Sequence, residues 1–170
     1  MQKKFAKSLL GLVLVAAVGI GGSVPARAAG STSAKGKHGQ TLTASITKGT
    51  LPAGETTNVT VSGKGFNTKT GIYATFCVMP EPGKKPETCG SYNITGINSQ
   101  AVWISSNPPF YASLLVKKFG KGGTFKVTLP ITSTIGEIDC TKVKCAIVTR
   151  ADHTNPENRK ADVIIPLTFK

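Results

Sequence analysis

The residues that could do acid–base chemistry are few and scattered. The 170-residue chain has two histidines, His38 and His153, and eight carboxylates. His38 lies in a stretch rich in Gly, Ser and Lys, so His153 is the better candidate for a positioned general base. Its neighbour Asp152 would point to the opposite face of an extended segment, and the sequence has no G-x-S-x-G nucleophile elbow. We therefore interpret His153 as a surface loop residue.

Two carboxylates, Glu137 and Asp139, have the spacing that lets paired catalytic groups share one face of a strand. Because Lys142 and Lys144 follow closely, charge pairing explains these carboxylates more simply. The sequence also lacks H-E-x-x-H and closely spaced thiolate pairs, and the Gly-rich stretch 120–123 does not match a phosphate-binding loop. We predict that the protein is not an enzyme and has no metal site.

The N-terminus has the pattern of a secretory signal peptide. Three lysines precede an uncharged apolar run from Leu9 to Ile20, and residues 26–28 read Ala-Arg-Ala. Because this run is short for a membrane span, residues 1–28 are interpreted as a cleaved signal peptide. Cleavage would take four positive charges from the formal net charge of +13, leaving about +9. With no second spanning segment after cleavage, we expect a secreted protein, extracellular or loosely associated with the cell wall.

All four cysteines follow this segment: Cys77, Cys89, Cys140 and Cys145. An even number of cysteines in an exported domain indicates disulfides rather than free thiols. Three pairings are possible. Bonds within the two close pairs, Cys77 with Cys89 and Cys140 with Cys145, are favoured because a hairpin easily brings such neighbours together. Each bond would stabilise one short ribbon by about 2 to 3 kcal/mol.

The elements that must position these residues are strands. Apolar and polar residues alternate with period two, and no helical period persists for three turns. Such runs occur at 42–46, 59–61, 72–79, 102–105, 114–116, 124–131, 145–150 and 162–169. With 39% hydrophobic residues and many Gly and Pro turns, the chain suits one packed domain. We predict an all-β fold, an immunoglobulin-like β-sandwich or barrel of about seven strands, over 41–170, after a flexible leader at 29–40.

The segment from Trp103 to Tyr111 looks least like scaffold, because it joins the single tryptophan to a Pro-Pro pair and further aromatic residues. In one interpretation, Trp103 and Phe110 form a wall of a ligand or partner site on a long loop. In the other, Trp103 fills the core while Pro108 and Pro109 cap a sheet edge. The sequence leaves both interpretations open.

Lysines gather at three places in the predicted domain: 84–85, 117–121 and 142–144. Because these clusters contain few aromatic residues and little arginine, a dedicated base-reading surface is not predicted. We expect a weak attraction to polyanions, such as DNA or cell-envelope polymers, that salt diminishes. The chain itself is predicted to be a monomer.

Three stretches around the cysteines form a recognisable framework: Val61–Phe66 with its Gly-Lys-Gly turn, the strand through Tyr73 to Cys77, and Asp-Cys-Thr at 139–141 before Cys145–Val148. This framework resembles that of the neocarzinostatin family of secreted actinobacterial apoproteins. It covers most of the predicted domain. It implies a seven-stranded immunoglobulin-like barrel, two side ribbons each closed by one disulfide, and a cleft between barrel and ribbons.

The same resemblance implies a non-catalytic binding protein. Members of the family hold an enediyne chromophore non-covalently in the cleft and deliver it to DNA, so the implied cargo is a small apolar antibiotic, enediyne-like chromophore. The ligand-binding candidates, carried over by position or taken from the aromatic segment, are Met79, Glu87, Ala146, Arg150, Trp103 and Phe110. Glu87 and Arg150 predict a charged cleft edge. The alternative is a secreted or cell-surface interaction module that binds envelope polymers or proteins without small-molecule cargo.

Overall fold

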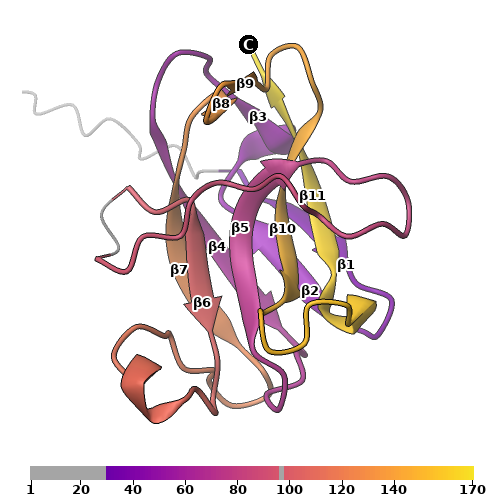
Figure 1. The fold of residues 1–170 in the computed structure, drawn as a ribbon. Coiled ribbons are helices and arrows are strands. Elements are labelled where there is room, and N and C mark those ends of the chain that lie inside the picture. Colours follow the sequence, from indigo (N-terminus) through magenta and orange to yellow (C-terminus); the bar gives the residue numbers. More distant parts are fainter. Residues whose placement is uncertain (1–29, 96–97) are drawn as a thin grey trace, which may run out of the picture.

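The computed structural model describes residues 30–95 and 98–170, and these residues form an all-β fold of eleven strands (Figure 1). One antiparallel sheet has the order β1 (Thr32–Lys35), β2 (Thr41–Ala44), β4 (Thr57–Lys64) and β7 (Phe125–Ile131). The other has the order β3 (Thr50–Leu51), β11 (Val163–Phe169), β10 (Cys145–Ala151), β5 (Ile72–Val78) and β6 (Ala101–Ile104). The remaining elements are the hairpin of β8 (Thr134–Ile135) with β9 (Ile138–Asp139), and the 3₁₀ turns η1 (Thr47–Gly49), η2 (Phe110–Ala112) and η3 (Arg159–Ala161).

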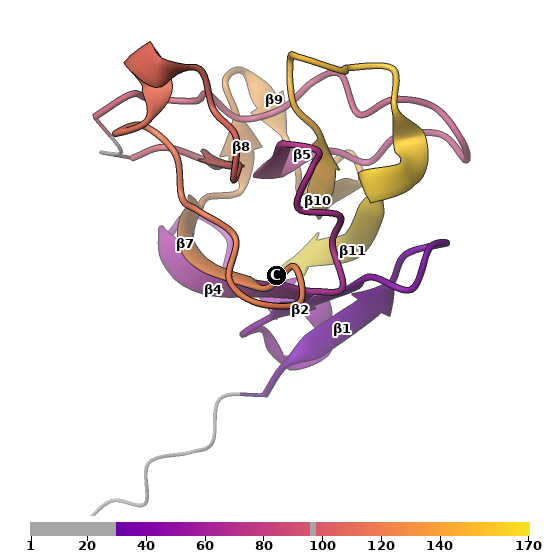
Figure 2. The ribbon, with the colours of Figure 1, turned by 90° about the horizontal axis from the view of Figure 1, so that it is seen from below.

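The two sheets pack face to face around one core, as the view from below makes plain (Figure 2). In β7, every second residue from Phe125 to Ile131 is buried, and β11 repeats this pattern from Val163 to Phe169. Between them lie large side chains such as Phe76, which is fully buried. The predicted all-β sandwich is therefore confirmed, with its inward residues supplied by period-two alternation.

The N-terminal boundary of the fold differs from the prediction. The leader at 29–40 was expected to be flexible, but within it β1 pairs antiparallel with β2. The Thr32 hydroxyl donates to the Ile46 carbonyl at 2.7 Å, and the Ser33 and Thr43 hydroxyls hydrogen-bond at 2.7 Å. The prediction was wrong for β1 because an edge strand can be polar on both faces and still pair through its backbone. The predicted signal peptide, 1–28, lies outside the described residues.

A second difference concerns 114–116, which were expected to form a strand. They lie in a turn that follows η2, and Leu114 is 96% exposed. The Ser105 amide donates to the Lys117 carbonyl at 3.0 Å, so the chain closes a loop instead of extending the sheet. Short apolar runs are ambiguous by periodicity alone, which is why the prediction failed here.

Both favoured disulfides are present. Cys77 at the end of β5 bonds to Cys89 and closes the first ribbon, defined here as residues 79–90. Cys140 bonds to Cys145 and closes the turn before β10. The return arm of the first ribbon also pairs with β5, since the Gly90 amide donates to the Phe76 carbonyl at 2.7 Å. The ribbon is therefore held against the five-stranded sheet by both covalent and backbone bonds.

Candidate functional site

The candidate site lies on the outer face of the five-stranded sheet. In the β5–β10 pair, Cys77 lies opposite Ala146 and Tyr73 lies opposite Arg150. Because their neighbours along each strand point into the main core, these residues face outward. Cys77, Ala146 and Val148 form a small second apolar cluster there, against which Cys89 packs. The first ribbon thus covers one end of this face and leaves the other end, around Tyr73 and Arg150, open.

At the open end lies a pocket of about 280 Å³. The side chains and backbone that line it are those of Tyr73, Thr75, Glu87, Cys89, Gly90, Tyr92, Ala101, Arg150 and His153. Tyr73 and Thr75 come from β5, Ala101 from β6 and Arg150 from β10. Glu87, Cys89 and Gly90 come from the return arm of the first ribbon, while Tyr92 follows that arm and His153 follows β10. We call this the aromatic pocket. Its size suits a small molecule of one or two rings.

Of the six predicted ligand-binding residues, the aromatic pocket brings together Glu87 and Arg150. Ala146 is fully buried beneath the ribbon, and Met79 is 37% exposed on the ribbon itself. Phe110 is 91% exposed on the separate loop after β6. These five predicted residues are therefore divided between the aromatic pocket, the sheet beneath the ribbon, the ribbon itself and the separate loop after β6.

Trp103, the sixth predicted residue, fits the interpretation in which it packs inside the protein. It is only 4% exposed, and its ring centroid lies 4.8 Å from that of His153. Its indole Nε1 donates to Asp152 Oδ2 at 2.8 Å. Trp103 therefore supports the aromatic pocket from behind, through His153, and does not itself line it.

Tyr73 is the centre of the aromatic pocket. Its ring centroid lies 5.9 Å from that of Tyr92 and 6.2 Å from that of His153. The Arg150 guanidinium carbon lies 5.7 Å from the Tyr73 ring centroid, a distance at which a cation is attracted to an aromatic face. The Tyr73 hydroxyl and His153 Nδ1 are 2.7 Å apart and hydrogen-bonded. Three rings and one cation therefore converge on one small space.

Arg150 uses only part of its hydrogen-bonding capacity within the described residues. Its Nη1 donates to the Pro86 carbonyl at 3.3 Å, which fixes the guanidinium beside the ribbon. Its Nε is buried and has no acceptor within the described residues. Leaving this donor unpaired is costly, and because Nε is buried, a ligand in the pocket meets the charge of the guanidinium rather than Nε.

Burial raises the pKa values of the two tyrosines in the pocket. Burial, and then the Asp152 charge and Tyr92, raise the pKa of Tyr73 to about 12, while Arg150 opposes the shift. Burial also raises the pKa of Tyr92. Both phenols stay protonated and act as hydrogen-bonding groups. Asp152, 2% exposed, is occupied by Trp103 and by Thr154, whose amide and hydroxyl donate to Oδ1 at 3.0 and 2.6 Å.

Near the second disulfide, Asp139 pairs with a neighbouring lysine, which is the structural role that the sequence favoured for it. Asp139 forms an ion pair with Lys142 at 3.2 Å. It also accepts hydrogen bonds from the Thr141 amide and hydroxyl, which lower the pKa of its carboxyl. Across residues 30–95 and 98–170, no three metal-ligating side chains come together. Nor does any helix in these residues have the length and hydropathy to cross a membrane.

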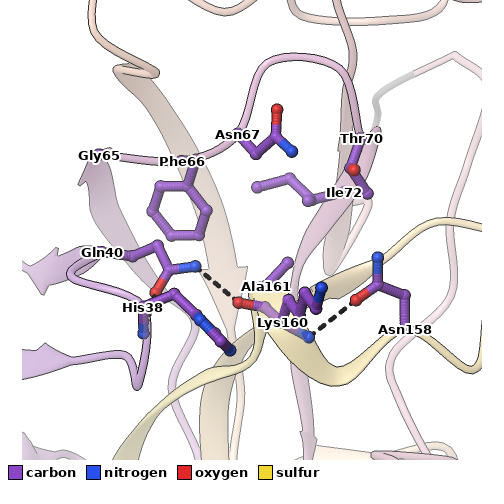
Figure 3. Close-up of a pocket in the computed structure, with 10 residues that line it drawn as sticks. All are labelled: His38, Gln40, Gly65, Phe66, Asn67, Thr70, Ile72, Asn158, Lys160 and Ala161. Carbon is purple, nitrogen blue, oxygen red and sulfur yellow. Dashed lines mark hydrogen bonds between the residues drawn. The ribbon is translucent and has the colours of Figure 1, made fainter.

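A second cavity, of about 290 Å³, lies at the end of the sandwich near η3 (Figure 3). Phe66, Ile72 and Ala161 give it apolar walls, and His38 lies at its edge. Gln40 Nε2, which also faces it, already donates to a backbone carbonyl of η3 at 2.6 Å. The Gln40 amide is therefore already hydrogen-bonded within the protein, and this cavity shows no cluster of aromatic rings around a cation like that of the aromatic pocket.

Sequence reasoning missed Tyr73 and Tyr92 as pocket residues. The alternation in β5 did place Tyr73 on the face opposite the core, and that was the available signal. Tyr92 follows the ribbon in an irregular segment, so its approach to Tyr73 depends on long-range packing that no local pattern encodes.

Comparisons with known proteins give little beyond the fold. No protein-family model matches the chain, and no curated protein matches it. Among solved structures, the chain is similar to macromomycin, with 18% identity, over 72% of this chain and 93% of macromomycin, at a TM-score of 0.43. This identity and this score are too low to transfer a function, so a function has to be argued from the site itself.

Proposed function

We propose that this chain is a secreted, non-catalytic binding protein that holds a small planar molecule in the aromatic pocket. The observation that carries the proposal is the convergence of Tyr73, Tyr92, His153 and Arg150 on one space of about 280 Å³. Aromatic walls with a few convergent polar groups are typical of small-molecule sites. Such walls suit the faces and edges of a planar ligand.

The polar groups narrow the class of ligand. Arg150 lines the pocket with a positive charge, which favours a carboxylate, phenolate or carbonyl on the ligand. Glu87 lies at the exposed side of the pocket and suits a donor or an amine at the other end. A planar molecule with an acceptor group at one end therefore matches the pocket best.

Binding is favoured over catalysis because the reactive groups are already engaged. Burial raises the pKa of Tyr73 to about 12, so its hydroxyl keeps its proton at neutral pH, and this hydroxyl is hydrogen-bonded to His153 Nδ1. The Asp152 carboxylate is held by Trp103. With Tyr73 protonated and with His153 Nδ1 and Asp152 engaged in hydrogen bonds within the protein, the pocket suits binding better than catalysis.

The sequence resemblance extends the proposal to an enediyne-like antibiotic chromophore that the protein delivers to DNA. A cargo much larger than about 280 Å³ would need the first ribbon to move away from the sheet. Plasmid nicking by protein purified from its own culture tests this step. Nicking that disappears after extraction with organic solvent supports delivery, whereas nicking that is absent before extraction contradicts it.

The ligand class can be tested with 2-naphthoate, a planar anion, by calorimetry and by quenching of the single tryptophan. We expect saturable binding to the wild-type protein. Arg150→Gln should weaken binding about tenfold or more, because it removes the cation and the planar fork. Tyr92→Ala should weaken it about tenfold through loss of one aromatic wall.

Lys144→Gln is the control, since it removes one positive charge from an exposed site outside the aromatic pocket. Its affinity for 2-naphthoate should match that of the wild type. Absence of saturable binding, or equal binding by Arg150→Gln and Lys144→Gln, would show that the ligand class is wrong.

A further inference from the structure

The loop between β6 and β7 exposes apolar side chains to an unusual degree. Within it, Phe110 is 91% exposed, Tyr111 70%, Leu114 96% and Leu115 38%. In the part of the chain that the structure describes, these are four of the seven large hydrophobic residues that are exposed. We call residues 105–117 the apolar loop. A contiguous exposed patch of this kind marks an interaction surface.

The apolar loop has an ordered backbone. Its base is closed by two hydrogen bonds, from the Ser105 amide to the Lys117 carbonyl at 3.0 Å and from the Lys117 amide to the Trp103 carbonyl at 2.8 Å. At its tip, the Ala112 amide donates to the Pro109 carbonyl at 2.9 Å, and Ala112 itself is buried. Because these backbone groups are already paired, the tip can leave water at a reduced cost.

The apolar loop is also fixed to the body of the protein. The Tyr92 hydroxyl donates to the Leu115 carbonyl at 3.1 Å. Figures 1 and 2 both show η2 at the outer end of a loop that projects beyond the two sheets. A projecting apolar tip fits a deformable layer more readily than a flat protein surface.

Positively charged residues follow the apolar tip in the sequence. Lys117, Lys118 and Lys121 follow the apolar residues, and Lys126 is exposed on β7. From residue 88 to residue 136 the sequence has these four lysines and no Asp or Glu. An apolar tip backed by lysines matches the interface of an anionic bilayer, where acyl chains lie beneath a layer of phosphate groups.

We propose that the apolar loop inserts into the interface of a membrane that contains anionic phospholipid. Phe110, Tyr111 and Leu114 enter the boundary between headgroups and acyl chains, while Lys117 and Lys118 meet the phosphates. The inference is separate from the small-molecule site, because none of these five residues lines the aromatic pocket. It concerns where the secreted protein acts rather than what it carries.

The test is flotation with vesicles, using the mature full-length protein and equal parts of phosphatidylglycerol and phosphatidylcholine at low salt. We expect wild-type protein to float with these vesicles and to stay behind with pure phosphatidylcholine. Phe110→Ser with Leu114→Ser should reduce the fraction bound at least about tenfold, because both side chains insert. Lys117→Gln with Lys118→Gln should reduce it about fivefold per lysine, and added salt should abolish the difference.

Matched controls separate insertion from general charge. Lys84→Gln with Lys144→Gln removes the same charge from exposed sites on the two disulfide-closed segments, and Val143→Ser removes an exposed apolar side chain there. Both controls should bind like the wild type. Trp103 fluorescence verifies that each variant is folded, since this residue is buried in the folded wild-type protein.

A second readout reports insertion directly. Phe110→Trp should shift its emission to the blue on vesicles and be quenched by brominated lipid, while the buried Trp103 contributes a constant background. Wild-type protein that does not bind anionic vesicles, or tip variants that bind as well as the controls do, would overturn the proposal. A concentration-dependent dimer that the serine variants abolish, without vesicle binding, would assign the tip to a second copy of this chain and equally overturn it.

Discussion

The Asp152 carboxylate offers the sharpest test of how the aromatic pocket is supported. Oδ2 accepts the Trp103 indole N–H at 2.8 Å, and Oδ1 accepts both the amide and the hydroxyl of Thr154. Asp152→Asn replaces one of these oxygens with an NH₂ group. Whichever way the amide turns, one NH₂ faces a donor, so the substitution cannot satisfy both sides.

The expected loss of stability follows from the burial of this site, since Asp152 is 2% exposed and Trp103 is 4% exposed. A hydrogen bond to a charged group contributes about 1.5 to 3 kcal/mol, and a buried donor left without an acceptor costs about 1 to 3 kcal/mol. Because these contributions overlap, we expect Asp152→Asn to lower the free energy of unfolding by about 2 to 4 kcal/mol. The domain should remain folded.

Asp139→Asn is the matched control. Asp139 makes the same pair of bonds, to the amide and hydroxyl of Thr141 two residues later, but its side chain is 37% exposed and its other partner is the exposed Lys142 rather than an indole. Urea unfolding at pH 7, followed by tryptophan fluorescence and circular dichroism, should give a much smaller loss for Asp139→Asn than for Asp152→Asn. Equal losses would refute the reasoning that the Trp103–Asp152 bond supports the pocket wall.

Three further predictions concern stability. Replacing the Cys77–Cys89 bridge with two alanines should cost about 3 kcal/mol in urea unfolding and replacing Cys140–Cys145 about 2 kcal/mol, because the first closes the longer loop; the reverse order would contradict this. Burial raises the pKa of Asp162 from 3.8 to about 6 despite an ion pair with Arg159 at 2.9 Å, so the fold prefers the protonated carboxyl. The free energy of unfolding should therefore fall by about 1 kcal/mol as the pH rises from 3.8 to about 6, and Asp162→Asn should flatten this part of the plot of Tm against pH. Gly123→Ala should cost about 2 kcal/mol or more, because Gly123 has a φ of 65° and an added Cβ would overlap a backbone carbonyl of the β4–β5 turn; a Tm equal to that of wild type would contradict this.

The sheets were predictable where one face of a strand is buried. Phe125 and Val163 each begin a run in which every second residue enters the core, so alternation alone located β7 and β11. β1 gave no such signal, because its residues bury neither face completely. Its pairing with β2 depends on backbone hydrogen bonds, and these leave no mark on composition.

The mistaken strand at 114–116 is informative for a physical reason. Sequence patterns assume that apolar residues are buried, and Leu114 is almost fully exposed. Places where this assumption fails are the places where function or a partner has to be considered. The same residues carry the inference of membrane insertion.

The candidate site was predictable only in part. The resemblance to the neocarzinostatin family implied that Glu87 and Arg150 lie at one cleft, and both line the aromatic pocket. Tyr73 and Tyr92 were missed as a pair, because they approach each other through the path of the first ribbon across the sheet. A covalent loop closure of this kind brings distant side chains together without any local periodicity.

Native mass spectrometry of protein purified from its own secretion medium measures directly whether this protein carries a small molecule. We expect an extra mass that organic solvent releases from the wild-type protein, and that is lost or strongly reduced in Arg150→Gln. A wild-type protein that is a bare polypeptide with two disulfides, or an Arg150→Gln variant that retains the same mass in full, would contradict the proposal that Arg150 helps to hold a small molecule.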